Sequence, residues 1–144
     1  MSTLAAPVAN GPNVISPALK TFLALDFGAK RTGVAVGNRI LRGAQPQGSI
    51  HAQGDARFVK IAELLAEWQP DALVIGVPFH PDGAEHENTV RARRFGRQLS
   101  GRFNLPVFEV DERYSTTEAL SAGAKDADAA AACIILAQFL RSID

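Results

Sequence analysis

The sequence predicts an α/β fold in which helices flank a mixed five-stranded sheet, built from an antiparallel meander and parallel strands. Three strand-like segments come first, and helix-like and strand-like segments then alternate along the chain. Short turns between the first segments favour antiparallel neighbours, whereas the later helices favour crossovers between parallel strands. With 144 residues, 47% of them apolar and 21% charged, the chain fits one globular domain.

The first third of the chain is expected to supply a leader and the meander. Three prolines and a glycine punctuate Met1–Lys20, which is interpreted as a flexible leader before a single domain at 21–144. Apolar residues dominate Thr21–Asp26 and Gly33–Asn38, which are predicted to be neighbouring strands. Two glycines and a proline interrupt Ile40–Ile50, so this segment is predicted to be an irregular edge strand.

The middle of the chain predicts two helices and two strands. Apolar residues recur at helical spacing in Asp55–Trp68, and Pro70 follows that segment. The apolar run Ala72–Val77 is typical of a strand covered on both faces. Asn88–Gly101 is predicted to be a helix with an apolar inner stripe, and Pro106–Val110 to be the last strand.

Two further helices are predicted after the last strand. Ser115–Ser121 begins with a residue that can cap a short helix, with Glu118 at the spacing of a capping box. Lys125–Ser142 is apolar almost all round in its middle, so this final helix is expected to be largely buried. The single cysteine, Cys133, lies in that apolar stretch and is interpreted as a small core residue.

Composition limits the classes of function. Fifteen basic and fifteen acidic side chains cancel, so any binding site for a polyanion must come from local clustering. The lone cysteine excludes an internal disulfide and favours a reducing compartment. The sequence shows neither a signal peptide nor an apolar run that could span a bilayer, so a cytoplasmic protein without membrane contact is expected.

Acidic residues stand where predicted elements end or begin. Asp26 closes the first strand, the pair Asp111 and Glu112 closes the last strand, and Asp128 opens the final helix. The carboxyl ends of neighbouring strands can bring such residues together, and clustered carboxylates repel one another unless cations bind among them. Mg²⁺ or Mn²⁺ would fit, which suggests metal-assisted hydrolysis of nucleic acid. Turn formation, pairing with arginine and complementing a helix dipole are the structural alternatives.

Basic residues form two groups that could contact phosphates. Lys30 and Arg31 follow Asp26 in the first turn, and five arginines lie outside the apolar stripe of the helix near 88–101. A solvated helix face is the more common explanation for such a run of arginines. Aromatic residues do not interleave with them, so base stacking is not indicated. Zinc is not favoured either, because His80 and His86 lack ligand spacing.

Four motifs together resemble the YqgF/RuvX family, whose members are described as Holliday junction resolvases and as nucleases that process pre-16S rRNA. They occur in the family's order between Phe22 and Leu140: LALDFGAKRTGVAVG, VIGVPFHPDGAEHENTVRARRFGRQL, VDERYSTTEA and DAAAACIILAQFL. The resemblance implies a ribonuclease H-like fold. The sequence departs from the family's pattern at Gly37-Asn38, where many members have Ser-Asp, and in a shorter segment between Ala119 and Asp128.

The resemblance also implies which residues form the site. It carries catalytic roles onto Asp26, Asp111, Glu112 and Asp128, with Asp26, Glu112 and Asp128 as the metal ligands; Glu112 is favoured over Asp111 as the metal-facing member of its pair. Basic residues at matching positions or on the arginine-rich helix are expected to contact substrate. They are Lys30, Arg31, Arg91, Arg94, Arg97 and Arg113.

Several functions remain open at this point. The first is a Mg²⁺- or Mn²⁺-dependent endonuclease that acts on structured RNA and matures the 5′ end of pre-16S rRNA in ribosome biogenesis. The same chemistry could resolve branched DNA, which would require two sites and hence a dimer; the sequence decides neither monomer nor homodimer. A non-catalytic, RNA-binding ribosome-assembly factor is a third possibility. An actin-like nucleotide-binding fragment is disfavoured, because the chain has no room for a second lobe.

Overall fold

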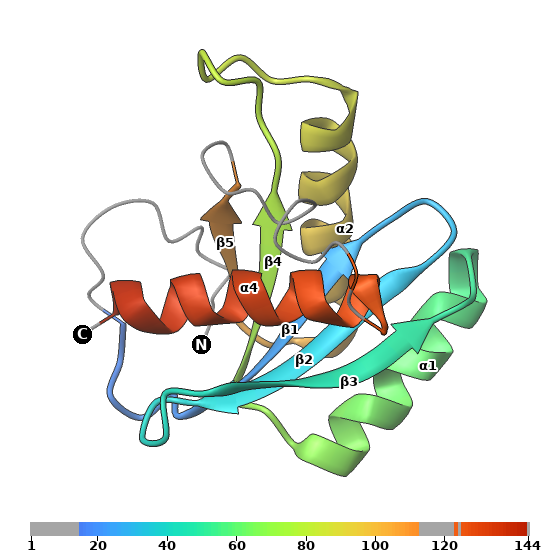
Figure 1. Ribbon diagram of the computed structural model, residues 1–144. Helices are drawn as coiled ribbons and strands as arrows, with labels where there is room; N and C mark the ends of the chain where they lie inside the picture. Colours follow the sequence, from blue (N-terminus) through green and yellow to red (C-terminus); the bar gives the residue numbers. More distant parts are fainter. Residues whose placement is uncertain (1–14, 113–122, 124, 144) are drawn as a thin grey trace.

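Five strands form one mixed sheet, as the sequence predicts. The structure, a computed structural model, describes residues 15–112, 123 and 125–143 (Figure 1). The strands are β1 (Thr21–Phe27), β2 (Thr32–Asn38), β3 (Ala44–Ile50), β4 (Ala72–Val77) and β5 (Val107–Asp111). Their order across the sheet is β3-β2-β1-β4-β5. The pairs β1–β2 and β2–β3 are antiparallel and the pairs β1–β4 and β4–β5 are parallel, which confirms both the meander and the crossovers.

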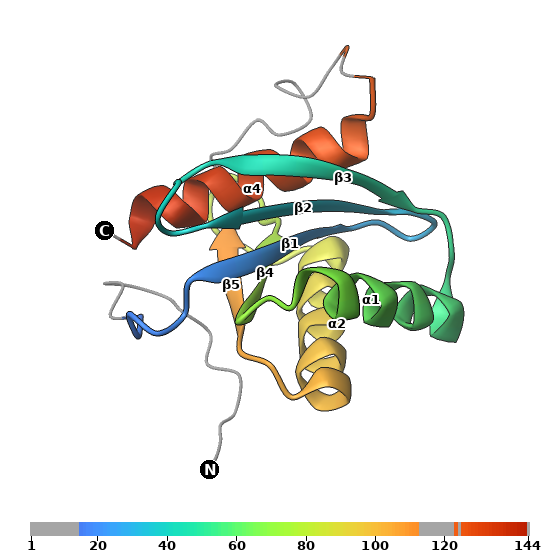
Figure 2. The same cartoon turned by 90° about the horizontal axis from the view of Figure 1, so that it is seen from below.

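Helices cover both faces of this sheet. One face carries α1 (Gly54–Trp68) and α2 (Glu87–Phe103), and the other carries α4 (Ala127–Ser142) (Figures 1 and 2). All three helices lie within two residues of the predicted bounds. The short helix predicted at Ser115–Ser121 lies outside the described residues. No helix in the described parts of the chain is long and apolar enough to cross a membrane.

Strand alternation divides the apolar side chains into two core clusters. On β1, Leu23 and Leu25 pack toward α1 and α2, whereas Phe22 and Ala24 pack toward α4. All six residues of β4 are buried, as expected for a central strand covered on both faces. Continued along β1, the same alternation directs Asp26 to the α4 face and Phe27 to the face of α1 and α2.

The edge strand β3 begins later than predicted. The predicted strand began at Ile40, but residues 39–43 form a turn in which the backbone oxygen of Asn38 accepts from the Arg42 amide and the side-chain oxygen of Asn38 from the Leu41 amide. Arg42 has a φ of 58° in this turn. β3 itself is irregular: it contains Pro46, its register with β2 shifts, and Gly48 has a φ of 87°.

The described end of the predicted leader lies against the domain. Ile15 and Leu19 pack against the core cluster on the α4 side. The Arg39 guanidinium donates to the backbone oxygen of Leu19 at 3.0 Å, and the Asp71 carboxylate accepts from the Thr21 amide at 2.9 Å. These bonds tie the start of β1 to its neighbours.

Candidate functional site

Asp26 and Glu112 stand at the carboxyl edge of the sheet, on β1 and directly after β5, the two strands that flank β4. Glu112 follows β5 directly, and its amide donates to the backbone oxygen of Val77 at 3.0 Å. A Cβ added at Gly76 would meet the Glu112 carboxylate and lie 2.6 Å from Ile135 Cδ1 of α4. The Glu112 carboxylate therefore lies over Gly76, on the same face as Asp26. Only glycine at position 76 leaves room for this arrangement.

The first turn of α4 brings Asp128 to the same place. Asp26 pairs with Gly33 across the β1–β2 ladder. A Cβ added at Gly33 would collide with the backbone oxygen of Asp128 and lie 3.0 Å from the Ala129 nitrogen. The absence of a side chain at Gly33 thus allows the start of α4 to dock directly beside the Asp26 position.

The electrostatics of Asp26 reflect this gathering of acids. The pKa of Asp26 is raised from 3.8 to about 7, first by burial and then by the charges of Glu112 and Asp128. Near neutral pH the Asp26 carboxyl is therefore poised between its protonated and ionised forms. A cation placed among the three carboxylates would relieve the repulsion and favour the ionised form.

Two neighbours hold Asp128 in its present orientation. Arg31 Nε lies 3.0 Å from Asp128 Oδ2, and the Ser49 hydroxyl of β3 donates to the same oxygen at 3.2 Å. Ser49 also donates to Asp126 at 2.9 Å. Asp126 caps α4 by accepting from the Ala129 amide, and this bond is the main reason that its pKa is lowered. The sequence reasoning missed Ser49, because 77 and 79 residues separate it from these partners.

The donor set suits a hard divalent cation, but the present arrangement is not a closed metal site. Three carboxylates supply the oxygen ligands that Mg²⁺ and Mn²⁺ prefer. The raised pKa of Asp26 shows that nearby positive groups do not balance its burial and the negative charges of Glu112 and Asp128. Within the described residues, no three His, Cys, Asp or Glu side chains have the spacing needed to hold a metal ion. Asp128 is turned toward Arg31 and Ser49 instead.

Asp111 lies apart from these three acids. Its neighbours Phe108 and Val110 pack on the α4 side, so alternation along β5 directs Asp111 to the face of α2. Glu109, on that same side, accepts from Arg93 of α2 at 3.4 Å. The geometry thus agrees with the preference for Glu112 over Asp111. Arg113, predicted to contact substrate, lies outside the described residues.

The turn between β1 and β2 carries the two basic residues next to Asp26. The Gly28 amide donates to the backbone oxygen of Arg31 at 2.9 Å and closes this turn. A Cβ at Gly28 would lie 2.7 Å from that oxygen, which explains the glycine. Lys30 is exposed, whereas Arg31 pairs with Asp128.

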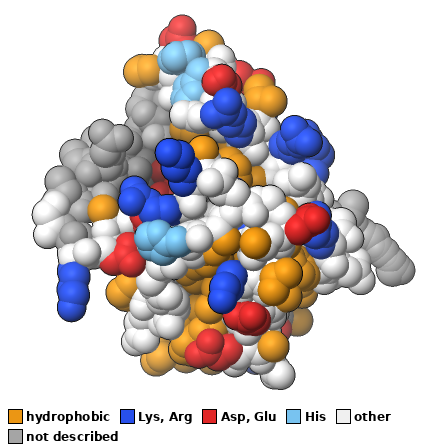
Figure 3. All heavy atoms as spheres, turned by 90° about the vertical axis from the view of Figure 1, so that its right-hand side faces the viewer, with side chains coloured by type: hydrophobic (Ala, Val, Ile, Leu, Met, Phe, Trp, Pro, Cys, Tyr) orange, Lys and Arg blue, Asp and Glu red, His pale blue; other side chains and the backbone are white. Residues whose placement is uncertain are grey.

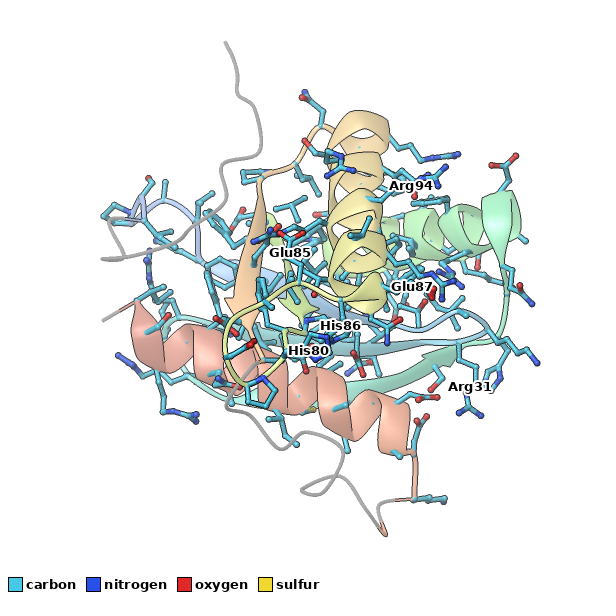
Figure 4. The ribbon with its side chains drawn as sticks, turned by 90° about the horizontal axis from the view of Figure 1, so that it is seen from above. Arg31, His80, Glu85, His86, Glu87 and Arg94 are labelled. Atoms are coloured by element: carbon cyan, nitrogen blue, oxygen red, sulfur yellow. The ribbon has the colours of Figure 1, made fainter. Side chains whose placement is uncertain are left out.

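The arginines of α2 are less uniform than the sequence pattern indicates. Arg93 pairs with Glu85 at 2.7 Å, and Arg91 pairs with Glu87 at 3.3 Å. Arg94 and Arg97 are exposed and form no ion pair with any described residue. The pairing acids precede the predicted helix or come from other elements, so the segment from 88 to 108 alone could not reveal them. Figure 4 shows Arg94 on α2 with Glu85 and Glu87 near the start of that helix.

The two histidines flanking the loop between β4 and α2 have a structural role. His86 Nδ1 accepts from the Asn88 amide at 3.1 Å, and the Thr89 hydroxyl accepts from the His86 amide at 3.1 Å, which forms a capping box. The His80 and His86 rings stand edge to face with centroids 4.7 Å apart (Figure 4).

The chain has close relatives among known proteins. Residues 20–142 match the RuvX family, described as "Holliday junction resolvase". A protein of Albidiferax ferrireducens named "Putative pre-16S rRNA nuclease" is 77% identical over 139 residues, which cover 96% of this chain and 88% of that protein. A Polaromonas protein of the same name is 67% identical over 129 residues, covering 90% of this chain and 94% of its own length.

A solved structure shares the fold at low sequence identity. Thermus thermophilus RuvC, in complex with a Holliday junction substrate, has a TM-score of 0.52 and 14% identity, and the match covers 84% of this chain and 93% of that chain. This likeness confirms the ribonuclease H-like fold.

Proposed function

From the premise that this chain belongs to the RuvX family of nuclease-type hydrolases, we propose that it is a metal-dependent endonuclease that cleaves structured RNA. The names of its relatives favour pre-16S rRNA as the substrate, and we assign the cleavage to maturation of its 5′ end. The observation that carries the proposal is the gathering of Asp26, Glu112 and Asp128 at one edge of the sheet, where burial first and then the charges of Glu112 and Asp128 raise the pKa of Asp26.

The three carboxylates would hold Mg²⁺ or Mn²⁺. A divalent ion there supplies charge that activates a water molecule and stabilises the oxygen that leaves the phosphorus. Ionised Asp26 and Asp128 would act as ligands, and Glu112 would bind the ion or orient the attacking water by accepting a hydrogen bond from it. Burial at the sheet edge keeps Asp26 away from competing solvent.

Arg31 connects ligand binding to substrate binding in this proposal. Its ion pair with Asp128 holds that carboxylate beside the β1–β2 turn. If Asp128 bound a cation instead, the guanidinium of Arg31 would be free beside the site and could donate to a phosphate of the substrate. Exposed Lys30, in the same turn, adds a second positive charge.

The test is the cleavage rate of a precursor rRNA fragment in Mn²⁺. Replacing one carboxylate removes a ligand whose contribution to the transition state is several kcal/mol, so Asp26→Asn should lower the rate by more than about 100-fold. Asp82→Asn is the matched control, because Asp82 is exposed and, among the described residues, accepts a hydrogen bond only from the Ala84 amide in its own loop. Equal rates for Asp26→Asn and the parent protein would overturn the proposal.

Branched DNA is the second candidate substrate, because the family is described as Holliday junction resolvase. A four-way DNA junction and an rRNA precursor assayed side by side with the same protein would separate the two. Faster cleavage of the junction, together with a dimeric state in solution, would favour resolution of DNA. Calorimetry that detects RNA binding but no Mn²⁺ binding would instead favour a non-catalytic assembly factor.

A further inference from the structure

An open groove of about 420 Å³ lies between α1 and α2, on the face of the sheet opposite the three carboxylates. Its lining includes the ring of Phe27, the amide of Gln98 and four arginines: Arg57, Arg91, Arg94 and Arg102. Asp55 is the one carboxylate of the lining, among the described residues. Figure 3 views the side of the molecule on which the β1–β2 turn and the start of α1 lie in Figure 1, and basic side chains are spread over it.

Arg57 is a buried charge without an acidic partner. Its side chain is 4% exposed, and it donates to the backbone oxygens of Ala29 at 2.7 Å and Ala52 at 3.2 Å. Its guanidinium carbon lies 4.5 Å from the centre of the Phe27 ring. No described carboxylate pairs with Arg57, and burial lowers its pKa. A buried cation compensated only by carbonyls and a ring leaves the groove electropositive.

The surroundings of Arg57 strengthen this field. Arg57 stands in the first turn of α1, where the helix dipole is positive and a cation is unfavourable unless an anion binds nearby. Gln53 caps α1 without a side-chain hydrogen bond to the first-turn amides, and both Gln53 and Gly54 line the groove. Arg94 faces the groove from α2 without an ion pair among the described residues.

We propose that the α1–α2 groove binds the phosphate backbone of the nucleic-acid substrate, as a contact separate from the carboxylates; this inference rests on the proposed function. The volume of the groove lies in the range that holds small ligands such as a nucleotide unit. Asp26 and Phe27 are consecutive on β1 and face opposite sides of the sheet. A strand that leaves the carboxylates can therefore pass the β1–β2 turn and enter the groove.

The contact is with phosphates rather than bases. Arg57 covers the Phe27 ring, and Arg102 lies 4.1 Å from the centre of the Phe58 ring. Those aromatic faces are therefore occupied and cannot stack on a base, whereas the edges of the guanidinium groups can still donate to phosphate oxygens. Binding at the groove is expected to tolerate any base sequence.

Binding of a fluorescein-labelled, single-stranded 12-nucleotide RNA, followed by anisotropy in EDTA, tests the groove without cleavage. Arg94→Gln removes one charge-assisted contact and should raise the Kd roughly tenfold. Arg97→Gln is the comparison variant: Arg97 is equally exposed on the same helix but does not line the groove, so its loss should be smaller than that of Arg94→Gln. Arg141→Gln, at an exposed position in the last turn of α4 and outside the groove, is the control and should leave the Kd unchanged. Asp55→Asn should lower the Kd, because it removes the carboxylate that lies 3.0 Å from Arg102.

Each outcome decides the matter. Equal losses for Arg94→Gln and Arg97→Gln would assign binding to the whole basic face of α2 and overturn the groove. Unchanged RNA binding in Arg94→Gln would also overturn it and leave an acidic protein segment as the occupant to examine. If thermal unfolding shows that Arg57→Gln folds, this variant should weaken RNA binding further than Arg94→Gln does. If Arg57→Gln does not fold, the comparison of Arg94→Gln with Arg97→Gln decides. The assay contains no metal, so it stands even if Asp26→Asn leaves cleavage intact.

Discussion

Asp26 places a negative charge where the protein alone stabilises it poorly. Its carboxyl is largely buried, and two further acids lie near it, so the pKa rises to about 7. Such a residue is costly to the fold when ionised, yet the ionised form is the one that a divalent cation needs. The energetic conflict is typical of residues that serve a ligand rather than the fold.

The conflict predicts an unusual dependence of stability on pH. The folded pKa of about 7 exceeds the ordinary value of 3.8, so between these limits the folded state binds more protons than the unfolded state and stability falls as pH rises. The difference corresponds to at most about 4 kcal/mol above pH 7. Asp26→Asn removes this term and should exceed the parent in free energy of unfolding at pH 8, and the gap should narrow as pH falls below 7 and close only below about pH 4.

Urea unfolding in EDTA across this pH range measures the effect, and Asp82→Asn again provides the control. Added Mn²⁺ should stabilise the parent protein at pH 8 and leave Asp26→Asn nearly unchanged. Parallel pH profiles for the parent and Asp26→Asn would show that the carboxyl is neither buried nor crowded in solution.

At this scale the sequence indicated the acids but not their immediate neighbours. Asp26, Glu112 and Asp128 stand at element ends, and ends of neighbouring elements can be recognised from pattern alone. Ser49 could not be predicted, because its contact depends on the irregular register of β3. The position of Arg57 in the first turn of a predicted helix, where the helix dipole disfavours a cation, is a sequence pattern that could have indicated a functional role for this residue.

Two glycines, Gly76 and Gly33, leave space for the close packing of α4 and Glu112 against the strands near the carboxylates. They differ in which atoms the methyl group of an alanine would contact at each position. At Gly76 the methyl would meet the tip of Glu112, a movable side chain, and Ile135 Cδ1. At Gly33 it would meet the backbone of α4, which cannot move without lifting the helix. The first position therefore governs the site more than the fold, and the second governs both.

Alanine substitutions should separate these roles. Gly33→Ala should lower the free energy of unfolding by roughly 1–3 kcal/mol, as overpacking does, and should reduce cleavage as Asp128 moves. Gly76→Ala should reduce cleavage with a smaller loss of stability, because Glu112 can turn away. Gly101→Ala is the control: its added Cβ meets nothing within 4 Å, and α2 gains up to about 1 kcal/mol of helix propensity.

Thermal unfolding and cleavage rates measured on the same three variants check this. A Gly76→Ala protein with full activity would show that Glu112 does not need its place over β4.

At the scale of elements, periodicity located all three described helices to within two residues, because apolar spacing and flanking prolines act locally. The predicted start of β3 was wrong. The side chain of Asn38 closes a turn there by accepting from the Leu41 amide, whereas the apolar residues Ile40 and Leu41 favoured a strand.

For the whole molecule, the formal net charge is zero, with fifteen residues of each sign. Attraction to nucleic acid therefore cannot come from the total charge and must come from the few cations that face a ligand without acidic compensation. The distribution of charge in the structure was not predictable from the sequence, since Asp55, Glu85 and Glu109 reach the α2 arginines from three other parts of the fold.

This balance predicts a weak dependence of RNA affinity on salt. About three phosphate contacts on a single strand should give a log–log slope of affinity against salt concentration of about −2. Anisotropy titrations at several concentrations of KCl measure the slope, and Arg94→Gln should reduce its magnitude by about 0.7. A much steeper slope in the parent protein would place binding on a broad basic surface instead.

The strand order also places the irregular strand β3 at an edge of the sheet. β3 is one of the two edge strands of the sheet that the described residues form, and it carries Pro46, which lacks an N–H group, and Gly48 in a left-handed conformation. Such an edge is a poor template for another strand, so neighbouring molecules are discouraged from joining into continuous sheets. The irregularity of β3 thus disfavours edge-to-edge association of strands between molecules.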